Sequence, residues 1–253
     1  MRLRVPLFSL LFFLVGITAN AAATRDIRKV VPLDPAGRVT VESHNGSVTV
    51  ATWDQPNVGI DARIEPAEYG GHPEDVQKVN VAIEGQGTEV RIESDYSAVP
   101  THLGWFGFSQ NLPPVHYTIH MPATGRLEVE VHNAGVNVNG VRDVTVTTHN
   151  GAVNLANLAG SAKVETHNGS IRLAYVQYTA PARIATHNGS CTVTVPPASR
   201  MTLRADTHTN RPITSNLPVA VSSRGSEYVA TLNGGGPELR FTAHNGSLEL
   251  SGR

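Results

Sequence analysis

Hydrophobic and polar residues alternate with a period of two along most of this chain. Between residues 162 and 173, for example, Ala162 and Val164 share one parity, and Lys163 and Glu165 share the other. Such alternation is typical of a β-strand with one buried face. Similar segments follow one another with almost no helix signal, so the pattern predicts an all-β protein.

Seven copies of nearly the same phrase interrupt these strands. The copies are His44-Asn45-Gly46-Ser47, His132-Asn133-Ala134-Gly135, His149-Asn150-Gly151, His167-Asn168-Gly169-Ser170, His187-Asn188-Gly189-Ser190, His208-Thr209-Asn210 and His244-Asn245-Gly246-Ser247. Asn-Gly is a strong turn signal, because glycine adopts positive φ without steric cost. Repetition at a short period indicates units that stack on their own copies and so bury an apolar face.

Two arrangements fit these repeats. Each Asn-Gly closes a tight antiparallel hairpin, or each is a corner of a coiled chain whose copies stack in parallel. From His132 to His208, successive histidines are 17, 18, 20 and 21 residues apart. A constant phrase with connections of variable length favours the second arrangement. We therefore predict a single-domain β-solenoid, a parallel β-helix-like stack of short strands, with an irregular N-terminal β-layer as its cap.

This prediction divides the chain into three parts. Residues 1–23 form a signal peptide, residues 24–126 an irregular β region with the first repeat, and residues 127–253 the Asn-Gly-turn repeats, with 30–253 as one continuous domain. Further segments with strand character in the N-terminal part are Val58 to Ile64, Val79 to Ile83, Glu89 to Ser94 and Val115 to Met121. Pro73 to Lys78 is compatible with one short helical turn.

The N-terminus has the pattern of a secretory signal. Arg2 and Arg4 precede an apolar run from Leu7 to Ile17, and Ala19-Asn20-Ala21 resembles a cleavage site. A retained N-terminal anchor is the alternative. No later stretch is long and apolar enough to span a bilayer, so we expect a secreted or periplasmic, cell-envelope protein without a transmembrane segment in its mature form.

Charge and cysteine content exclude several classes. The formal net charge is −1 with no long charge run, so no basic footprint for a nucleic-acid partner is visible. Cys191 is the only cysteine, so an intrachain disulfide is excluded. It occupies a position that is aliphatic in other copies, and we predict a small core hydrophobe instead of a reactive thiol.

Three segments, in this order, resemble the bacterial putative-adhesin family. They are Gly37-Arg38-Val39-Thr40-Val41, Asn45-Gly46-Ser47-Val48-Thr49-Val50-Ala51-Thr52-Trp53-Asp54 and Tyr117-Thr118-Ile119-His120-Met121-Pro122, followed by the run of Asn-Gly copies. The resemblance covers roughly residues 30–253 and implies a secreted or envelope-associated β-solenoid of unknown function. The chain departs from the family pattern in placing His before nearly every Asn, and in an extra residue in the turn at 207–212.

The asparagines of the phrase share the parity of the buried residues. We predict that they form a structural ladder of stacked amides, since buried polar groups are normally paired internally. The predicted ladder is Asn133, Asn150, Asn168, Asn188 and Asn245.

The histidines take the opposite parity and are expected to face outward. At a strand spacing of about 4.8 Å they would form a row along one edge. This row is His132, His149, His167, His187 and His208. Three interpretations stay open: an exposed turn residue copied with its repeat, a Zn²⁺ or Cu²⁺ site, and a pH-responsive row. No carboxylate or cysteine recurs at a fixed offset to complete a metal shell, so we predict no metal and no cofactor.

A short aromatic segment is the second candidate binding feature. Trp105, Phe106 and Phe108 lie between two strand signals and are flanked by Pro100 and Pro113. They either cover an open end of the stack or form an exposed patch for a partner, a glycan or a membrane surface.

Nothing in the sequence points to catalysis. The expected outward acids are scattered, and no nucleophile elbow, His-Glu-x-x-His motif or phosphate loop is present. We predict a non-catalytic binding module whose ligand is a cell-surface glycan or an envelope protein. A polysaccharide-acting β-helix enzyme and a purely structural envelope component are the alternatives. Strand edges at the ends of the stack also leave association between copies open.

Overall fold

The computed structural model describes residues 24–68, 70–104, 107–109, 111–208, 213–222 and 227–253. The all-β prediction is confirmed, and the one short helix, η1 (Pro73–Lys78), lies where a helical turn was expected. The strands are β1 (Arg25–Trp53), β2 (Asn57–Ile64), β3 (Asn80–Asp95), β4 (His102–Gly104), β5 (Gly107–Ser109), β6 (Val115–Pro122), β7 (Arg126–Asn139), β8 (Asp143–Asn150), β9 (Val153–Leu158), β10 (Ala162–Asn168), β11 (Ile171–Tyr175), β12 (Ala182–Val195), β13 (Met201–Thr207), β14 (Ile213–Ser215), β15 (Ala220–Val221), β16 (Tyr228–Leu232) and β17 (Glu238–Gly252). Within these ranges, no helix has the length and apolar character needed to cross a bilayer.

The strand pairings show that the predicted solenoid is wrong. Six parallel strands form a ring in the order β7, β8, β10, β12, β11 and β9, and β9 pairs back with β7. The fold is a closed six-stranded parallel β-barrel, with the other strands of the large sheet outside it. The N-terminal strands are among these outer strands.

The ring closes because two of its strands are longer than the others. β7 and β12 run through the Asn-Gly corner without a break, so each pairs with one neighbour before the corner and with another after it. In the two copies that lie between β7 and β12, the corner interrupts the strand. β8 ends at Asn150 and β9 begins at Val153, and β10 and β11 are divided in the same way. Repetition in the sequence indicates parallel neighbours in register. The repetition gives no signal that the last strand of the ring, β9, pairs back with the first, β7.

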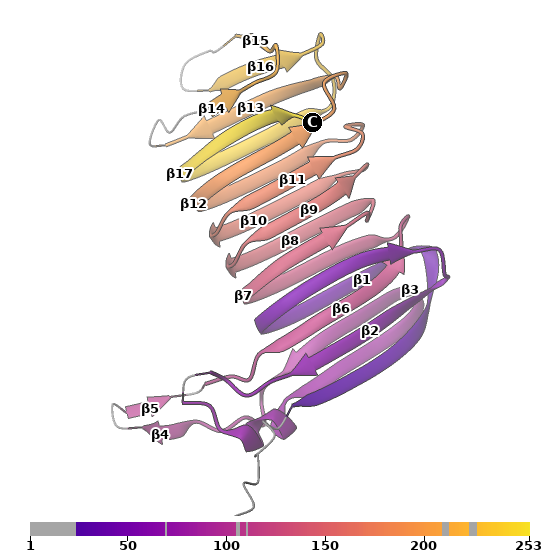
Figure 1. Cartoon of the computed structure of the whole chain (residues 1–253), viewed down its shortest axis with the longest axis vertical. Coiled ribbons are helices and arrows are strands. Elements are labelled where there is room, and N and C mark those ends of the chain that lie inside the picture. The colour runs from indigo at the N-terminus through magenta and orange to yellow at the C-terminus, as the bar shows by residue number, and fades with distance from the viewer. Residues whose placement is uncertain (1–23, 69, 105–106, 110, 209–212, 223–226) are drawn as a thin grey trace, which may run out of the picture.

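The outer strands extend the sheet at both ends, with the N-terminal strands at the bottom of Figure 1 and the C-terminal strands at the top. β1 pairs in parallel with β7, while β2 pairs antiparallel with β1 and β6. β3 is one strand where two were predicted, and its middle contains Gly85 and Gly87 in the positive-φ region.

The C-terminal strand does not follow the order of the chain. β17 lies between β12 and β13 and is parallel to both. The copy that contains His187 therefore neighbours the copy with His244, and His208 comes after it. The expected adjacency of His187 and His208 is wrong. The predicted extra turn residue falls at 209–212, outside the described residues.

The interior is filled by the apolar parity of each strand. Val146, Val164, Ile184 and Phe241 lie in one register row across β8, β10, β12 and β17, and all are fully buried. Cys191 is also buried, between Ile171 and Leu248 in register, and burial raises the pKa of its thiol. Removal of this apolar surface from water is the main stabilising contribution to the fold.

The corners bring the backbones of neighbouring copies very close together. At Gly151, φ is 150°, and a Cβ atom would lie 2.1 Å from the carbonyl oxygen of Ala134. At Gly135, which lies at the corner of β7 one residue beyond the position that corresponds to Gly151, the nearest atom to such a Cβ would be 3.8 Å away. Of these two corner glycines, Gly151 is sterically required and Gly135 is not.

We expect Gly151→Ala to lower the free energy of unfolding by about 2 kcal/mol or more, because the added methyl group collides with a backbone that the sheet holds in place. The matched Gly135→Ala change should alter stability by less than about 0.5 kcal/mol. Urea denaturation followed by circular dichroism measures both values. Equal effects of the two substitutions would contradict this description of the corners.

Candidate functional site

Seven histidines, one from each copy of the phrase, form a column of stacked rings. In spatial order they are His44, His132, His149, His167, His187, His244 and His208. The first six rings have centroids 4.6 to 4.8 Å apart and planes within 12° of parallel. The last ring is 5.4 Å from its neighbour and tilted by 37°. All seven residues are exposed, and we call this set the histidine column.

An amide ladder next to the column fixes its register. Five asparagines each donate a hydrogen bond of 2.8 to 3.1 Å from Nδ2 to the Oδ1 atom of the asparagine in the preceding copy, and Asn45, the first acceptor, donates to the carbonyl oxygen of Leu112 at 3.3 Å. The ladder is Asn45, Asn133, Asn150, Asn168, Asn188 and Asn245, which adds Asn45 to the predicted set. Its first and last donors, Asn133 and Asn245, are exposed and the others are half-buried. The ladder therefore lies at the corner and not in the core.

The outward residue two positions before each column histidine determines which charge lies beside that histidine on its own strand. In spatial order from β1 to β13 this row is Glu42, Glu130, Thr147, Glu165, Ala185, Thr242 and Asp206. His149, His187 and His244 thus have uncharged residues at that position on their own strands.

At the N-terminal end, three carboxylates lie in one register row. Glu42 of β1 pairs with Glu93 of β3 and with Glu130 of β7. They line a surface hollow together with His44 and His132, which we call the acidic hollow. Sequence reasoning missed it, since the three acids lie on strands far apart in the chain and share no motif.

One arginine partly neutralises this hollow. Arg91 Nη2 lies 2.7 Å from Glu42 Oε2, and Arg91 Nε lies 3.4 Å from Glu93 Oε2. The edge of the Tyr96 ring contacts His44, with ring centroids 6.3 Å apart.

A row of basic residues runs parallel to the histidine column, on the same outward face and four residues before the histidine of each strand. Lys163, Arg183, Arg240 and Arg204 occupy matching positions on β10, β12, β17 and β13. We call these four residues the basic row. They lie on consecutive strands of the same sheet, although any two of them are at least 20 residues apart in the sequence.

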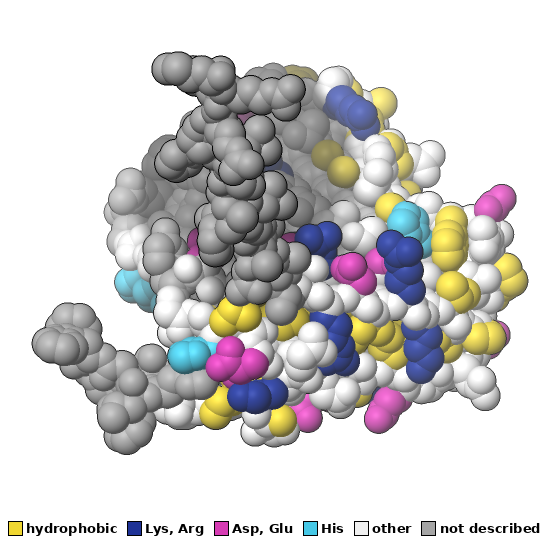
Figure 2. Space-filling view, turned by 60° about the horizontal axis from the view of Figure 1, so that its bottom comes forward, with side chains coloured by type: hydrophobic (Ala, Val, Ile, Leu, Met, Phe, Trp, Pro, Cys, Tyr) yellow, Lys and Arg dark blue, Asp and Glu magenta, His cyan; other side chains and the backbone are white. Residues whose placement is uncertain are grey.

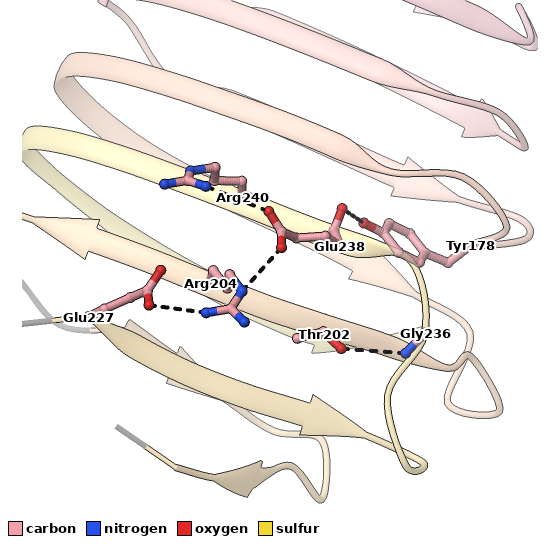
Figure 3. Close-up of polar contacts among 7 residues, drawn as sticks. All are labelled: Tyr178, Thr202, Arg204, Glu227, Gly236, Glu238 and Arg240. Carbon is pink, nitrogen blue, oxygen red and sulfur yellow. Dashed lines mark hydrogen bonds and ion pairs between the residues drawn. The ribbon is translucent and has the colours of Figure 1, made fainter. Parts of the chain in front are cut away.

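Most of the basic row is paired with carboxylates. Arg204 contacts Glu227 and Glu238 at 3.1 Å each, and Arg240 lies 3.9 Å from Glu238 (Figure 3). Lys163 Nζ lies 3.1 Å from Glu165 Oε1. Among the described residues, Arg183 has no ion-pair partner.

Ion pairs also occur elsewhere on the surface, as between Arg28 and Asp61 at 2.8 Å. In the space-filling view, basic and acidic side chains are interspersed over the visible face, and neither sign forms a large area there (Figure 2). The formal charge of −1, with the histidines neutral, likewise gives the whole chain little net charge.

The pKa values of two column histidines are lowered. For His187, loss of hydration is the larger cause, and the neighbouring His167 and His244 add repulsion. For His44, the causes are burial and then His132. Loss of hydration, followed by repulsion from the neighbouring imidazoles, thus disfavours protonation of these two residues.

Other predicted site residues are not part of the column. Trp105 and Phe106 lie outside the described residues, and Phe108 is in β5, opposite Leu103 of β4. The signal-peptide prediction, at residues 1–23, also lies outside the described ranges. In those ranges, no group of three or more His, Cys, Asp or Glu side chains is arranged to hold a metal ion.

Comparisons with known proteins give fold-level matches only. No family model and no curated protein matches the chain. A solved putative cell adhesion protein from Clostridium sporogenes is 12% identical, with 90% of this chain and 100% of that chain covered and a TM-score of 0.48.

Two further solved structures carry the description putative adhesin. One is from Bacteroides fragilis, with 10% identity, coverage of 90% and 97%, and a TM-score of 0.35. The other is from Parabacteroides merdae, with 9% identity, coverage of 90% and 96%, and a TM-score of 0.24. The descriptions of these three structures name the kind of protein that the sequence resembles, and nothing about a ligand follows from them.

Protonation of His44 and His187 should destabilise the protein. Because the pKa values of His44 and His187 are lower than the value near 6.5 of an unfolded chain, the unfolded state takes up protons first as the pH falls. Their contribution to stability is complete above about pH 6.5 and is lost as the pH falls through the lowered values.

We therefore expect the urea midpoint to fall between about pH 7.5 and about pH 5, a range in which histidines titrate. His187→Gln should reduce this fall, since the substituted residue cannot be protonated and one like-charge contact on each side is removed. A midpoint that is unchanged or rises towards pH 5 would contradict the description of the column.

Proposed function

We propose that the protein is a non-catalytic binding protein of the cell surface or extracellular space, with the histidine column as the centre of its binding surface. The observation that carries this proposal is the exposure of seven stacked imidazoles at one edge of the sheet. The corners do not require them, because the amide ladder and the close-packed glycines already fix the turn.

The chemistry of the column suits a ligand with repeating polar groups. Each neutral imidazole offers one nitrogen as a donor and one as an acceptor, and the column repeats them at 4.6 to 4.8 Å. A polymer laid across the strands would meet the same groups at every step. Many weak contacts of this kind add up along a polymer.

The lack of a catalytic role is supported by the state of the carboxylates. Glu42 and Glu93 contact Arg91, Glu165 contacts Lys163, and Glu238 contacts Arg204. Asp143 accepts hydrogen bonds of 2.6 and 3.0 Å from Ser161, which lower its pKa. A general acid near neutral pH needs the opposite environment, one that favours the protonated carboxyl group.

The acidic hollow supports a second candidate, a polysaccharide-cleaving enzyme. Glycosidases use two carboxyl groups on either side of the scissile bond, and Glu42, Glu93 and Glu130 lie together in this hollow.

Incubation of polysaccharides with the protein, followed by an assay for new reducing ends, distinguishes the two candidates. Our proposal predicts no increase over time. A steady increase that is abolished by Glu130→Gln would establish the enzyme instead.

The binding proposal is tested with the double substitution His149→Gln/His167→Gln. Glutamine keeps a polar side chain at these exposed sites, so we expect the circular dichroism spectrum to remain unchanged. Binding to the polymers recognised by the wild-type protein on a glycan array should fall by about tenfold or more, because the middle of the column is removed.

A matched control changes the outward face on the other side of the corner. Arg172→Gln/Glu249→Gln alters two exposed residues of β11 and β17 without changing the net charge, and it should leave binding unchanged. Loss of binding in this control, with retention in the histidine variant, would contradict the proposal. A wild-type protein that binds no polymer would overturn it in favour of a structural envelope component.

A further inference from the structure

We infer that the ligand of the histidine column is a linear carboxylated polysaccharide that lies across the strands and binds more tightly as the pH falls below about 6.5. This inference rests on the proposed function and names the chemical class of its ligand. It is carried by the geometry of the column and by the distribution of fixed charge around it.

The geometry favours a linear polymer over a compact ligand. The column runs perpendicular to the strands, and its six regular rings are separated by 4.6 to 4.8 Å. A polyuronate presents one carboxylate per sugar along an extended chain, so successive carboxylates can face successive or alternate rings. The phosphates of a DNA strand are only about 3.4 Å apart along the axis, and the surface lacks the permanent basic footprint that such a partner needs.

Most fixed charges near the column are paired at neutral pH, and carboxylates are in excess, because Glu130 and Asp206 have no ion-pair partner among the described residues. In the basic row, Lys163, Arg204 and Arg240 all contact carboxylates, which leaves Arg183 as the one cation of that row without an acidic partner among the described residues. The carboxylates closest to the column are Glu42, Glu130, Glu165 and Asp206, at the adjacent outward position. Protonation of the histidines is therefore the main change of charge available to this face.

The section around His187 and His244 is where this change is least compensated. The adjacent outward residues on the same strands are Ala185 and Thr242, which have no charge and pair with each other in register. The nearest carboxylates of this row, Glu165 on β10 and Asp206 on β13, lie one strand beyond on either side. Arg183, on the same strand as Ala185, adds a permanent positive charge beside this section.

A carboxylated ligand would supply the missing counter-charge. Imidazoles held 4.6 to 4.8 Å apart repel one another once protonated, so adjacent charges are unfavourable in the free protein. The pKa of His187 is lowered by loss of hydration and then by this repulsion from His167 and His244. Carboxylates placed along the column favour the protonated rings, so binding and proton uptake must strengthen each other. Uronate carboxyl groups keep their negative charge well below the range in which histidine titrates.

The test uses polygalacturonate as the probe and pullulan, a linear neutral polysaccharide, as its comparison. Isothermal titration calorimetry at about pH 5.5 and about pH 7.5 brackets the titration of histidine. We expect polygalacturonate to bind about tenfold or more tightly at the lower pH, with net uptake of protons measured from buffers of different ionisation enthalpy. Circular dichroism at both pH values verifies that the protein remains folded.

Three variants locate the effect on the surface. His187→Gln/His244→Gln should reduce the pH dependence, because it removes the two imidazoles of the least compensated section, whereas Arg183→Gln should weaken binding at both pH values and leave their ratio nearly unchanged. Arg172→Gln, which removes an exposed cation on the other outward face, should have little effect.

The outcomes separate this inference from the proposed function. Binding of pullulan that is lost in the histidine variant and does not depend on pH would overturn the inference and leave the proposed function standing. Polygalacturonate affinity that is equal at the two pH values, or unaffected by the histidine substitutions, would also overturn the inference. A lack of binding to every polysaccharide at both pH values would overturn both.

Discussion

The in-register pairing of identical corners is the constraint on which the rest of this structure depends. Parallel strands place each asparagine of the phrase beside the asparagine of the next copy, and the amide bonds between them hold that register. A slip of one residue would exchange the inward Thr166 for the outward His167 and break the ladder. The alignment of the imidazoles is thus a direct consequence of the alignment of the amides.

This constraint gives the molecule an unusual surface. Side chains that would repel one another when charged are held 4.6 to 4.8 Å apart, while nearby fixed charges are mostly paired. This face has no excess of fixed positive charge when the histidines are neutral, and each protonation adds one positive charge to it. Stacked imidazoles at this spacing couple the charge of one ring to the charge of the next.

Much of this could be predicted from the sequence, and the limits have physical reasons. Period-two alternation and the repeated phrase predict the strands, their parallel register and the outward direction of the histidines, because these are local properties of the backbone. Closure of the barrel and the insertion of β17 between β12 and β13 depend on where strands continue through a corner and where the C-terminus returns, which no local pattern encodes. The acidic hollow was missed for the same reason, since Glu42 and Glu93 meet only through long-range pairing.

Cross-linking across the column tests the central claim most directly. Neighbouring column positions should accept a disulfide, since the side chains are one strand spacing apart, and Cys191 is buried and will not compete. On mild oxidation we predict that the variant His187→Cys/His244→Cys forms an intramolecular disulfide efficiently, although these positions are far apart in the sequence. The variant His187→Cys/His208→Cys should not, because β17 lies between the two strands. Efficient cross-linking of the second pair and not the first would contradict the register from which the column, the ladder and the binding surface all follow.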